Sequence, residues 1–298
     1  MRTVPLLSPR FFAAVPLLAS ACWARAAISY ASAGATYSEN FNGLPKDTAN
    51  NANLETVYTN GWQDDSTTVA GDHISVPGWY LFHGTSNAEG GTSGFQRLRI
   101  GNGANTGSFW GFGTNAAAAD MALGSLGSAT VAANNTNMYI AVRLTNDTGG
   151  VLTAITVNYD GEEWRDGQSA AAESLVFDYS TTALVSDWNT TAAYTAVPAL
   201  NFSSPVFSGT ATGGTAVDGN TAGLSANITA TITGITWAPG TDLWLRWADN
   251  SLPTLADDGM AIDNFSFSAV PEPTGATLTG AGMAVLLAAR RRRIPGSR

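Results

Sequence analysis

Carboxylate side chains gather in two stretches of this sequence, and they are the residues best suited to chemistry. The first stretch, NYDGEEWRDG, surrounds Trp164 and Arg165 with Asp160, Glu162, Glu163 and Asp166. The second, ADNSLPTLADDGMAIDN, contains Asp249, Asp257, Asp258 and Asp263. Crowded oxygen ligands on loops suit Ca²⁺, which takes about six to eight of them. The alternative is structural: the aspartates cap turns, and Glu162 or Glu163 pairs with Arg165 or Arg246.

The sequence contains few residues or motifs that could support catalysis. Glu162 and Glu163 are neighbours on an expected strand, so their side chains point to opposite faces and cannot flank one glycosidic bond together. The motifs G-x-S-x-G, H-E-x-x-H and the P-loop are absent, and the two histidines are His73 and His83. The single cysteine, Cys22, lies near the N-terminus. Triad, zinc and cysteine-based enzymes are therefore poorly supported.

Tryptophan is the other chemical resource, with nine in the chain. Exposed tryptophans stack on sugar rings, whereas most aromatic residues of strands fill a core. Trp244 and Trp247 cannot both point inward from one regular strand, so one of them should reach an outer face. We expect a ligand face in this region, formed by Trp164, Arg165, Trp244, Arg246 and Trp247.

The elements that must position these residues are strands. Alternation of period two runs through MYIAVRLTND, LTAITVNYDGEEW, SLVFDYS and TDLWLRWADN. The segments NDTGG, YDGEE, ATGGTAVDGN and WAPGTD have turn compositions. A short helix is expected only at 116–127. The pattern predicts one all-β domain over residues 27–269, an antiparallel β-sandwich of the jelly-roll type.

Composition narrows the class of protein. The net charge is −9, and charged residues make up only 12 % of the chain, while aromatic residues reach 10 %. Most of the basic residues lie in the two terminal segments, so the body is more acidic than the whole. No basic surface for phosphate backbones is expected, which argues against nucleic acid as a partner.

The N-terminus has the features of a secretory signal helix. Arg2 and Arg10 precede an apolar run, and Ala24-Arg25-Ala26 fits a cleavage site for signal peptidase after Sec export. We expect residues 1–26 to be removed, with the cut after Ala26 or Ala27. Lipidation of Cys22 is the alternative, although Ala19 stands where a large aliphatic residue is usual.

The C-terminus carries Val270-Pro271-Glu272-Pro273, an apolar segment from 274 to 289, and then Arg290, Arg291, Arg292 and Arg293. This arrangement resembles the PEP-CTERM sorting signal of Gram-negative bacteria. The resemblance covers residues 270–293, followed by a tail at 294–298. It implies a transmembrane helix that anchors the chain transiently in the inner membrane, processing by an exosortase, and final placement at the cell surface or in the extracellular matrix.

The body resembles, more weakly, jelly-roll domains of such sorted proteins, through SENFNGLP, G-E-x-W-R and the ending D-D-G-x-A-I-D-N. The ending is also similar to the last strand of MAM and laminin-G-like sandwiches. Such folds place the first and last strands side by side, which implies that Glu39 reaches Asp263 or Asp258. Together with Asp257 these residues form the expected structural Ca²⁺ site.

We therefore expect an exported, surface-sorted, non-enzymatic β-sandwich that acts in matrix or cell-envelope interactions, with extracellular polysaccharide as its ligand. Two alternatives stay open. One is a glycan-active enzyme using Asp or Glu, which requires paired carboxylates in an aromatic-lined groove. The other is a purely structural matrix protein without a ligand site, in which the surplus tryptophans are all buried.

Overall fold

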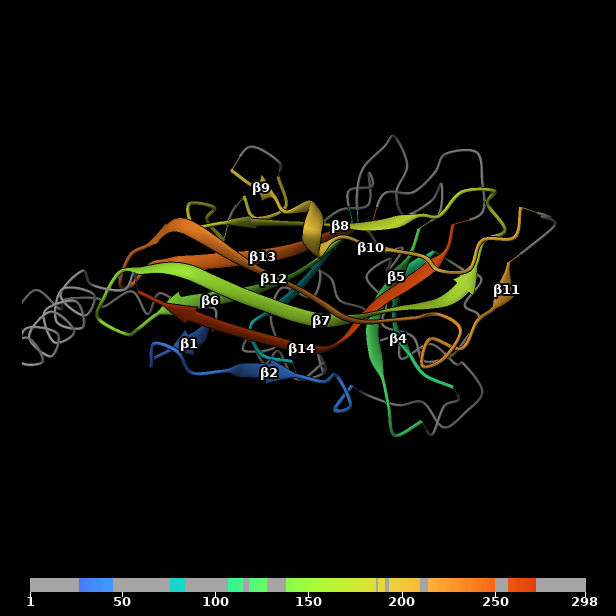
Figure 1. The fold of residues 1–298 in the computed structure, drawn as a ribbon, viewed down its shortest axis with the longest axis horizontal. Coiled ribbons are helices and arrows are strands. Elements are labelled where there is room, and N and C mark those ends of the chain that lie inside the picture. Colours follow the sequence, from blue (N-terminus) through green and yellow to red (C-terminus); the bar gives the residue numbers. More distant parts are fainter. Residues whose placement is uncertain are drawn as a thin grey trace, which may run out of the picture.

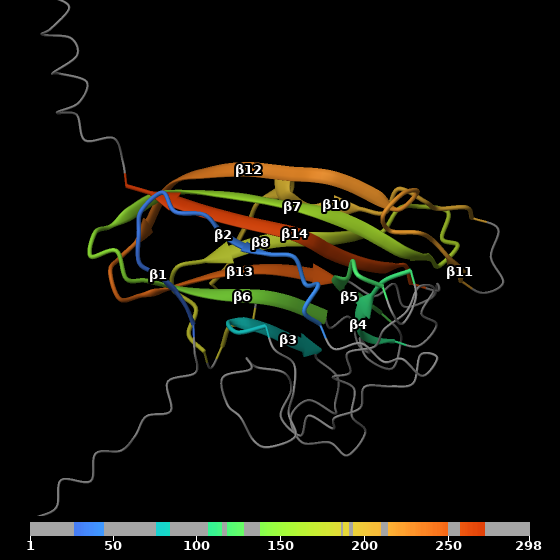
Figure 2. The same cartoon turned by 90° about the horizontal axis from the view of Figure 1, so that it is seen from below.

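The computed structural model describes residues 27–44, 76–83, 107–114, 118–127, 138–185, 187–190, 193–209, 214–249 and 257–271. These residues form two curled β-sheets that face one another (Figure 1, Figure 2). Within them, no helix is long and apolar enough to cross a bilayer. The expected signal helix and C-terminal helix lie outside the described residues, as do Cys22 and His73.

The first sheet follows the order β1-β6-β13-β8-β10, with β3 beside β6 and β9 beside β8. Its strands are β1 (Ile28–Tyr30), β3 (Trp79–His83), β6 (Met138–Asn146), β8 (Ser174–Ser180), β9 (Thr195–Ala196), β10 (Phe202–Ser203) and β13 (Asp242–Asp249). Neighbouring strands are antiparallel except that β1 runs parallel to β6. The short helix η1 (Pro198–Leu200) connects β9 to β10.

The second sheet follows the order β11-β7-β14-β5-β4, with β12 beside β7 and β2 beside β14. Its strands are β2 (Tyr37–Glu39), β4 (Ser108–Phe112), β5 (Ala122–Leu126), β7 (Leu152–Asp166), β11 (Thr215–Ala216), β12 (Leu224–Trp237) and β14 (Gly259–Val270). The pairing of β2 with β14 places Glu39 opposite Phe265. The first strand, β1, lies beside β6 in the other sheet, so the expected pairing of the first and last strands is met by the second strand, β2, instead.

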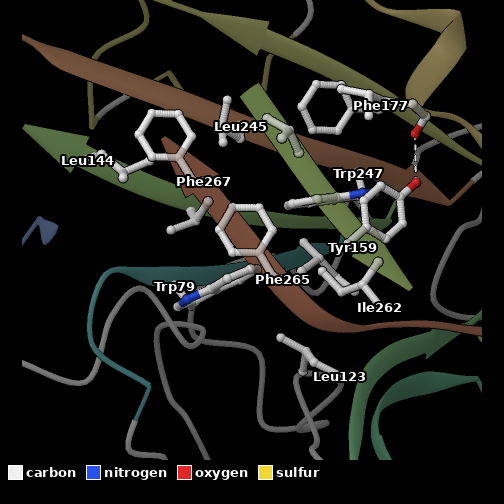
Figure 3. Packing of buried hydrophobic residues seen from close by; sticks show 14 of the residues in the cluster. Trp79, Leu123, Leu144, Tyr159, Phe177, Leu245, Trp247, Ile262, Phe265 and Phe267 are labelled. Atoms are coloured by element: carbon white, nitrogen blue, oxygen red, sulfur yellow. Dashed lines mark hydrogen bonds between the residues drawn. The ribbon is translucent and has the colours of Figure 1, made fainter. Parts of the chain in front are cut away.

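One core lies between the sheets, and the alternation of the sequence explains its membership. Ile140, Val142 and Leu144 of β6 point into it, as do Ile155, Val157 and Tyr159 of β7. At its centre Trp247 packs against the rings of Trp79, Tyr159, Phe177 and Phe265, with ring centroids 5.2–5.9 Å apart (Figure 3). The all-β sandwich predicted from period-two alternation is confirmed.

Two local predictions were wrong. The segment 116–127 contains β5 instead of a helix, since Leu123 and Leu126 are needed as buried strand residues between β4 and β14. The stretch YDGEE is not a turn but the middle of β7. Gly161 lies there because the Phe202 ring packs on it: an added Cβ would come within 2.4 Å of that ring. This glycine makes room for a neighbour instead of bending the chain.

Candidate metal centre

The two acidic stretches of the sequence meet between β7 and β14. Strand β14 pairs with β7, and the register shifts between Gly259 and Met260, because Gly259 lies opposite Arg165 while Met260 lies opposite Glu163. Trp164 is the extra residue of this bulge. Bulges redirect the side chains around them. The result is that Glu163, Asp166 and Asp258 converge.

Glu163, Asp166 and Asp258 form what we call the carboxylate cluster. One carboxylate oxygen of each lies within 4.8 Å of the other two, and all three residues are buried. Among the described residues this is the one group of three or more such side chains that could hold a metal ion. Two of its members come from the first acidic stretch and one from the second.

Hydrogen bonds from the surrounding backbone fix the orientation of these carboxylates. Val206 N–H donates to Glu163 Oε2 at 2.8 Å, and Gly167 N–H donates to Asp258 Oδ1 at 2.6 Å. Asp166 accepts from the Gln168 N–H at 2.5 Å and from the Ser208 hydroxyl at 2.8 Å. Gln168 closes the turn after β7 with a φ of 67°. The ligand atoms are thus held in place before any ion arrives.

Two oxygens of the cluster have no hydrogen-bond partner among the residues that the structure describes. Glu163 Oε1 and Asp258 Oδ2 are both buried and unpaired, and their residues are 0 % exposed. A buried carboxylate oxygen without a partner costs free energy unless a proton or a cation satisfies it. A proton on Glu163, whose pKa burial raises to about 8, or a cation bound between Glu163 and Asp258 would satisfy these oxygens.

The described residues place more acidic side chains around the carboxylate cluster than the single guanidinium of Arg165 can neutralise. Glu173, Asp249 and Asp257 lie near Asp258, and Arg165 is the guanidinium that these carboxylates share. Burial raises the pKa of Glu163 to about 8 and that of Glu173 to about 9, with the neighbouring carboxylates adding to both shifts. Burial lowers the pKa of Arg165 itself. A divalent ion would remove this imbalance of charge.

The Ca²⁺ set expected from the sequence is divided by the structure. Asp258 lies in the carboxylate cluster, and Asp257 beside it offers its backbone oxygen to Arg165. Asp263 lies elsewhere, opposite Asp160 on β7 and near Glu39 and Asp120. Glu39 accepts a hydrogen bond from the Phe41 N–H at 2.8 Å. The sequence placed Glu163 and Asp166 in an acidic stretch but gave no sign that a bulge would bring them to Asp258.

Glu162 faces the opposite way from Glu163, as the alternation of a strand requires. Its Oε2 accepts a hydrogen bond from Trp164 Nε1 at 2.9 Å, and it lies near Asp263. Burial and the Asp263 charge raise the pKa of Glu162 to about 8. Both glutamates are buried, so they are not a catalytic pair across a groove.

The five residues expected to form a ligand face are all buried. Trp247 lies in the central core, and Trp164 stacks on Phe112 with the ring planes at 2°. Trp244 does reach the outer face of the first sheet, as the alternation predicted. There Trp188 stacks on it with the planes at 5° and the centroids 5.6 Å apart. These side chains therefore form no exposed stacking platform.

Arg246 holds the segment that covers this outer face. Its guanidinium binds Asp178 through Nε and Nη2, and Nη1 donates to the carbonyls of Trp188 and Thr190 at 2.9 and 2.6 Å. It also lies over the rings of Tyr139 and Tyr194. Four of the five N–H donors of Arg246 are used within the fold and the side chain is buried, so it presents no exposed cation to a ligand.

The sorting motif is described only at its start. Val270 ends β14 and is 43 % exposed, and Pro271 follows it. Glu272, Pro273 and Arg290, Arg291, Arg292 and Arg293 lie outside the described residues.

Comparison with known proteins gives no family. No family model and no curated protein matches this chain. Solved structures with low similarity include a xylan-binding domain from Paenibacillus barcinonensis, with 13 % identity and a TM-score of 0.34 over 81 % of this chain and 98 % of the other. An adhesin domain of Lys-gingipain from Porphyromonas gingivalis has 13 % identity and a TM-score of 0.33 over 64 % and 91 %. A domain solved with β-1,4-galactotriose has 10 % identity and a TM-score of 0.27 over 52 % and 74 %.

Asp263 allows a test of the buried charge on this side of the β7–β14 pair. Burial, with the charges of Asp120, Asp160 and Glu39, raises the pKa of Asp263 to about 7, against about 4 for an exposed aspartate. Its ionised form therefore destabilises the fold. This penalty is absent below about pH 4, grows up to about pH 7 and then stays constant. We expect Asp263→Asn to be more stable than the wild type at pH 8, by about 1 to 3 kcal/mol, and to lose this advantage at pH 4.

Urea unfolding at the two pH values, with EDTA present, measures the difference. The wild type supplies the control at each pH. An effect of Asp263→Asn that does not change with pH would contradict the assignment of a buried, unneutralised carboxylate.

Proposed function

We propose that this chain is an exported, surface-sorted, non-enzymatic β-sandwich of the jelly-roll type that binds Ca²⁺ and acts in interactions of the cell envelope or extracellular matrix. The observation that carries the proposal is the carboxylate cluster, with two buried oxygens that no group of the described chain satisfies. Carboxylate ligands from β7 and from the residue just before β14 suit Ca²⁺ better than a soft metal. The ion would join the end of β7 to the start of β14.

The non-enzymatic assignment is supported by the surroundings of the acidic residues. Glu162, Glu163, Asp258 and Asp263 are each buried and turned into the protein, where backbone and tryptophan N–H groups bind the first three. General acid–base catalysis needs such a group within hydrogen-bond reach of a substrate. A structural ion explains the same residues without a substrate.

Polysaccharide is the ligand that we propose for the exposed surface, on the outer face of the second sheet. Two cross-strand rows cross this face: Thr231, Thr156 and Ser268, and beside them Thr229, Asn158, Ser266 and Ser38. All of these side chains are uncharged hydroxyls or amides at least partly exposed to solvent. Such a surface offers hydrogen bonds without net charge, which fits a neutral polysaccharide.

The competing function is a structural matrix protein without a ligand. It is favoured by one observation: every tryptophan that the described ranges include is buried. The two functions differ only in whether the outer face of the second sheet binds a partner.

Ca²⁺ binding is tested by thermal unfolding with Ca²⁺ or EDTA. We expect Ca²⁺ to stabilise the wild type, by about 2.7 kcal/mol at a concentration one hundred times its Kd. Glu163→Gln and Asp258→Asn should lose this response, and in EDTA at about pH 9 they should be more stable than the wild type, because each removes a carboxylate that is both buried and ionised at that pH. Glu39→Gln is the matched control and should respond like the wild type.

The opposite pattern would contradict the proposed Ca²⁺ site. A response lost in Glu39→Gln and kept in Glu163→Gln would reject the carboxylate cluster in favour of the site around Asp263. Isothermal titration calorimetry of the same four proteins reports the stoichiometry, for which we expect one ion.

Polysaccharide binding is tested on a glycan array. We expect the wild type to bind at least one neutral polysaccharide and Thr156→Lys to lose most of this binding, because the long charged side chain covers the hydroxyl rows. Leu184→Lys, which places the same charge on a residue 62 % exposed in the segment over the other sheet, is the control. Absence of binding by the wild type to every glycan would leave the structural function.

Export and sorting are tested by fractionating cells and measuring intact masses. We expect the mature protein to begin after Ala26 or Ala27 and to end near Pro271, since the resemblance implies cleavage near the Pro-Glu-Pro motif. Replacing Arg290 through Arg293 with serine should impair membrane retention, as the positive side of the anchor is lost. An unprocessed C-terminus in the wild type, or a lipid on Cys22, would contradict the proposed route.

A further inference from the structure

Strand β12 is an unusually long free edge. It has 14 residues, and among the described elements only β7 pairs with it. The other described strands at the sheet edges are β1, β2, β3, β4, β9, β10 and β11, with two to five residues each. In Figure 2, β12 runs along the margin of the molecule with no labelled strand beyond it. Proteins usually keep edge strands short, because an open row of N–H and C=O groups invites another strand.

The sequence of β12 lacks the usual protection of such an edge. LSANITATITGITW contains no charged residue and no proline. Its register with β7 shifts between Ser225 and Ile228 and again between Thr233 and Trp237, while the six residues from Ile228 to Thr233 pair without interruption. Helix η1 lies beside β12, but in the described chain no backbone hydrogen bond reaches Ile228–Thr233 from any element other than β7. Among the described residues, the outer backbone edge of this regular stretch therefore has no hydrogen-bonded neighbour.

The side chains of this stretch suit a further strand on both faces. Ile228, Ala230 and Ile232 point inward and pack against the core, yet they are only partly buried. Thr229, Thr231 and Thr233 point outward and are exposed. A strand added beside β12 would cover the apolar side chains and continue the threonine face.

The order of residues in this stretch is self-complementary, and we propose that a second copy of this chain pairs antiparallel with β12 about a two-fold axis through Thr231. Antiparallel partners share a face. Thr231 would lie opposite its own copy, and Thr229 opposite the other copy's Thr233. On the inner face Ala230 would meet Ile232. The symmetric pairing thus matches threonine with threonine and an apolar residue with an apolar residue.

The distribution of charge favours this edge over the rest of the surface as the place where a second copy binds. The chain has a net charge of −9, so two copies repel over most of their surfaces. Residues 228–233 and the facing residues 154–159 of β7 carry no charge. Two acidic molecules can therefore approach here without placing carboxylates opposite one another. This inference does not depend on the Ca²⁺ site or on a glycan.

Disulfide trapping tests both the dimer and its register. In a Cys22→Ser background, Thr231→Cys places the two thiols directly opposite, with Cβ atoms about 4.5–5.5 Å apart. We expect this variant to form a reducible dimer under mild oxidation. Thr229→Cys should not, because its partner is Thr233. Thr156→Cys, one strand inward, should not either, since its copies lie three strand spacings or about 14 Å apart.

Self-association is measured independently by sedimentation equilibrium of the wild type, where we expect a monomer–dimer equilibrium. Thr231→Lys brings two ammonium groups together on the axis and should weaken the dimer about tenfold or more. Thermal unfolding of each variant shows whether it has kept the fold. A wild type that stays monomeric overturns the proposal, as do equal cross-linking of Thr156→Cys and Thr231→Cys or a dimer unaffected by Thr231→Lys.

Discussion

The pairing of β7 with β14 is the constraint on which the rest of the structure depends. The two strands form the centre of the second sheet, and β12, β11, β2 and β5 attach to their outer edges. Tyr159 of β7 and Phe265 of β14 meet Trp247 of the opposite sheet, so the same pair supplies one wall of the core. Its two register shifts, after Gly259 and after Asp263, decide which acidic residues meet. The β7–β14 pairing therefore determines both one wall of the core and the positions of the buried carboxylates.

Burying so many carboxylates along this ladder is costly, and the fold limits the cost in two ways. Glu162 and Asp258 each accept a hydrogen bond from a group within the protein. The alternation of β7 also turns Glu163 away from Glu162, so the acids form two groups on opposite sides of the strand pair. Among the described residues, one carboxylate oxygen stays unpaired on each of Glu163, Glu173, Asp249, Asp258 and Asp263.

The sequence predicted the parts of the fold that depend on alternation. In β6 and β13 each residue faces the side expected from period two, and Trp244 and Trp247 take opposite faces as required. It did not predict that Trp244 would be covered, because the covering segment docks through Arg246 and Trp188, which are distant in sequence. It also misread Gly161 and the segment 116–127, where contacts with Phe202 and with β14 outweigh local preference. The residue types were enough to identify the two acidic stretches. Only the strand register shows that Glu163, Asp166 and Asp258 converge.

The carboxylate cluster has a consequence for when the chain becomes stable. A ligand that binds only the folded state adds stability that rises with its free concentration, by about 4 kcal/mol at a thousand times its Kd. Free Ca²⁺ is scarce inside cells and plentiful outside them. For the exported, Ca²⁺-binding chain that we propose, the folded state would be less stable before secretion, when the chain must cross the membrane unfolded, and more stable afterwards. Ca²⁺ bound to the unpaired oxygens of Glu163 and Asp258 would then stabilise the folded state only after export.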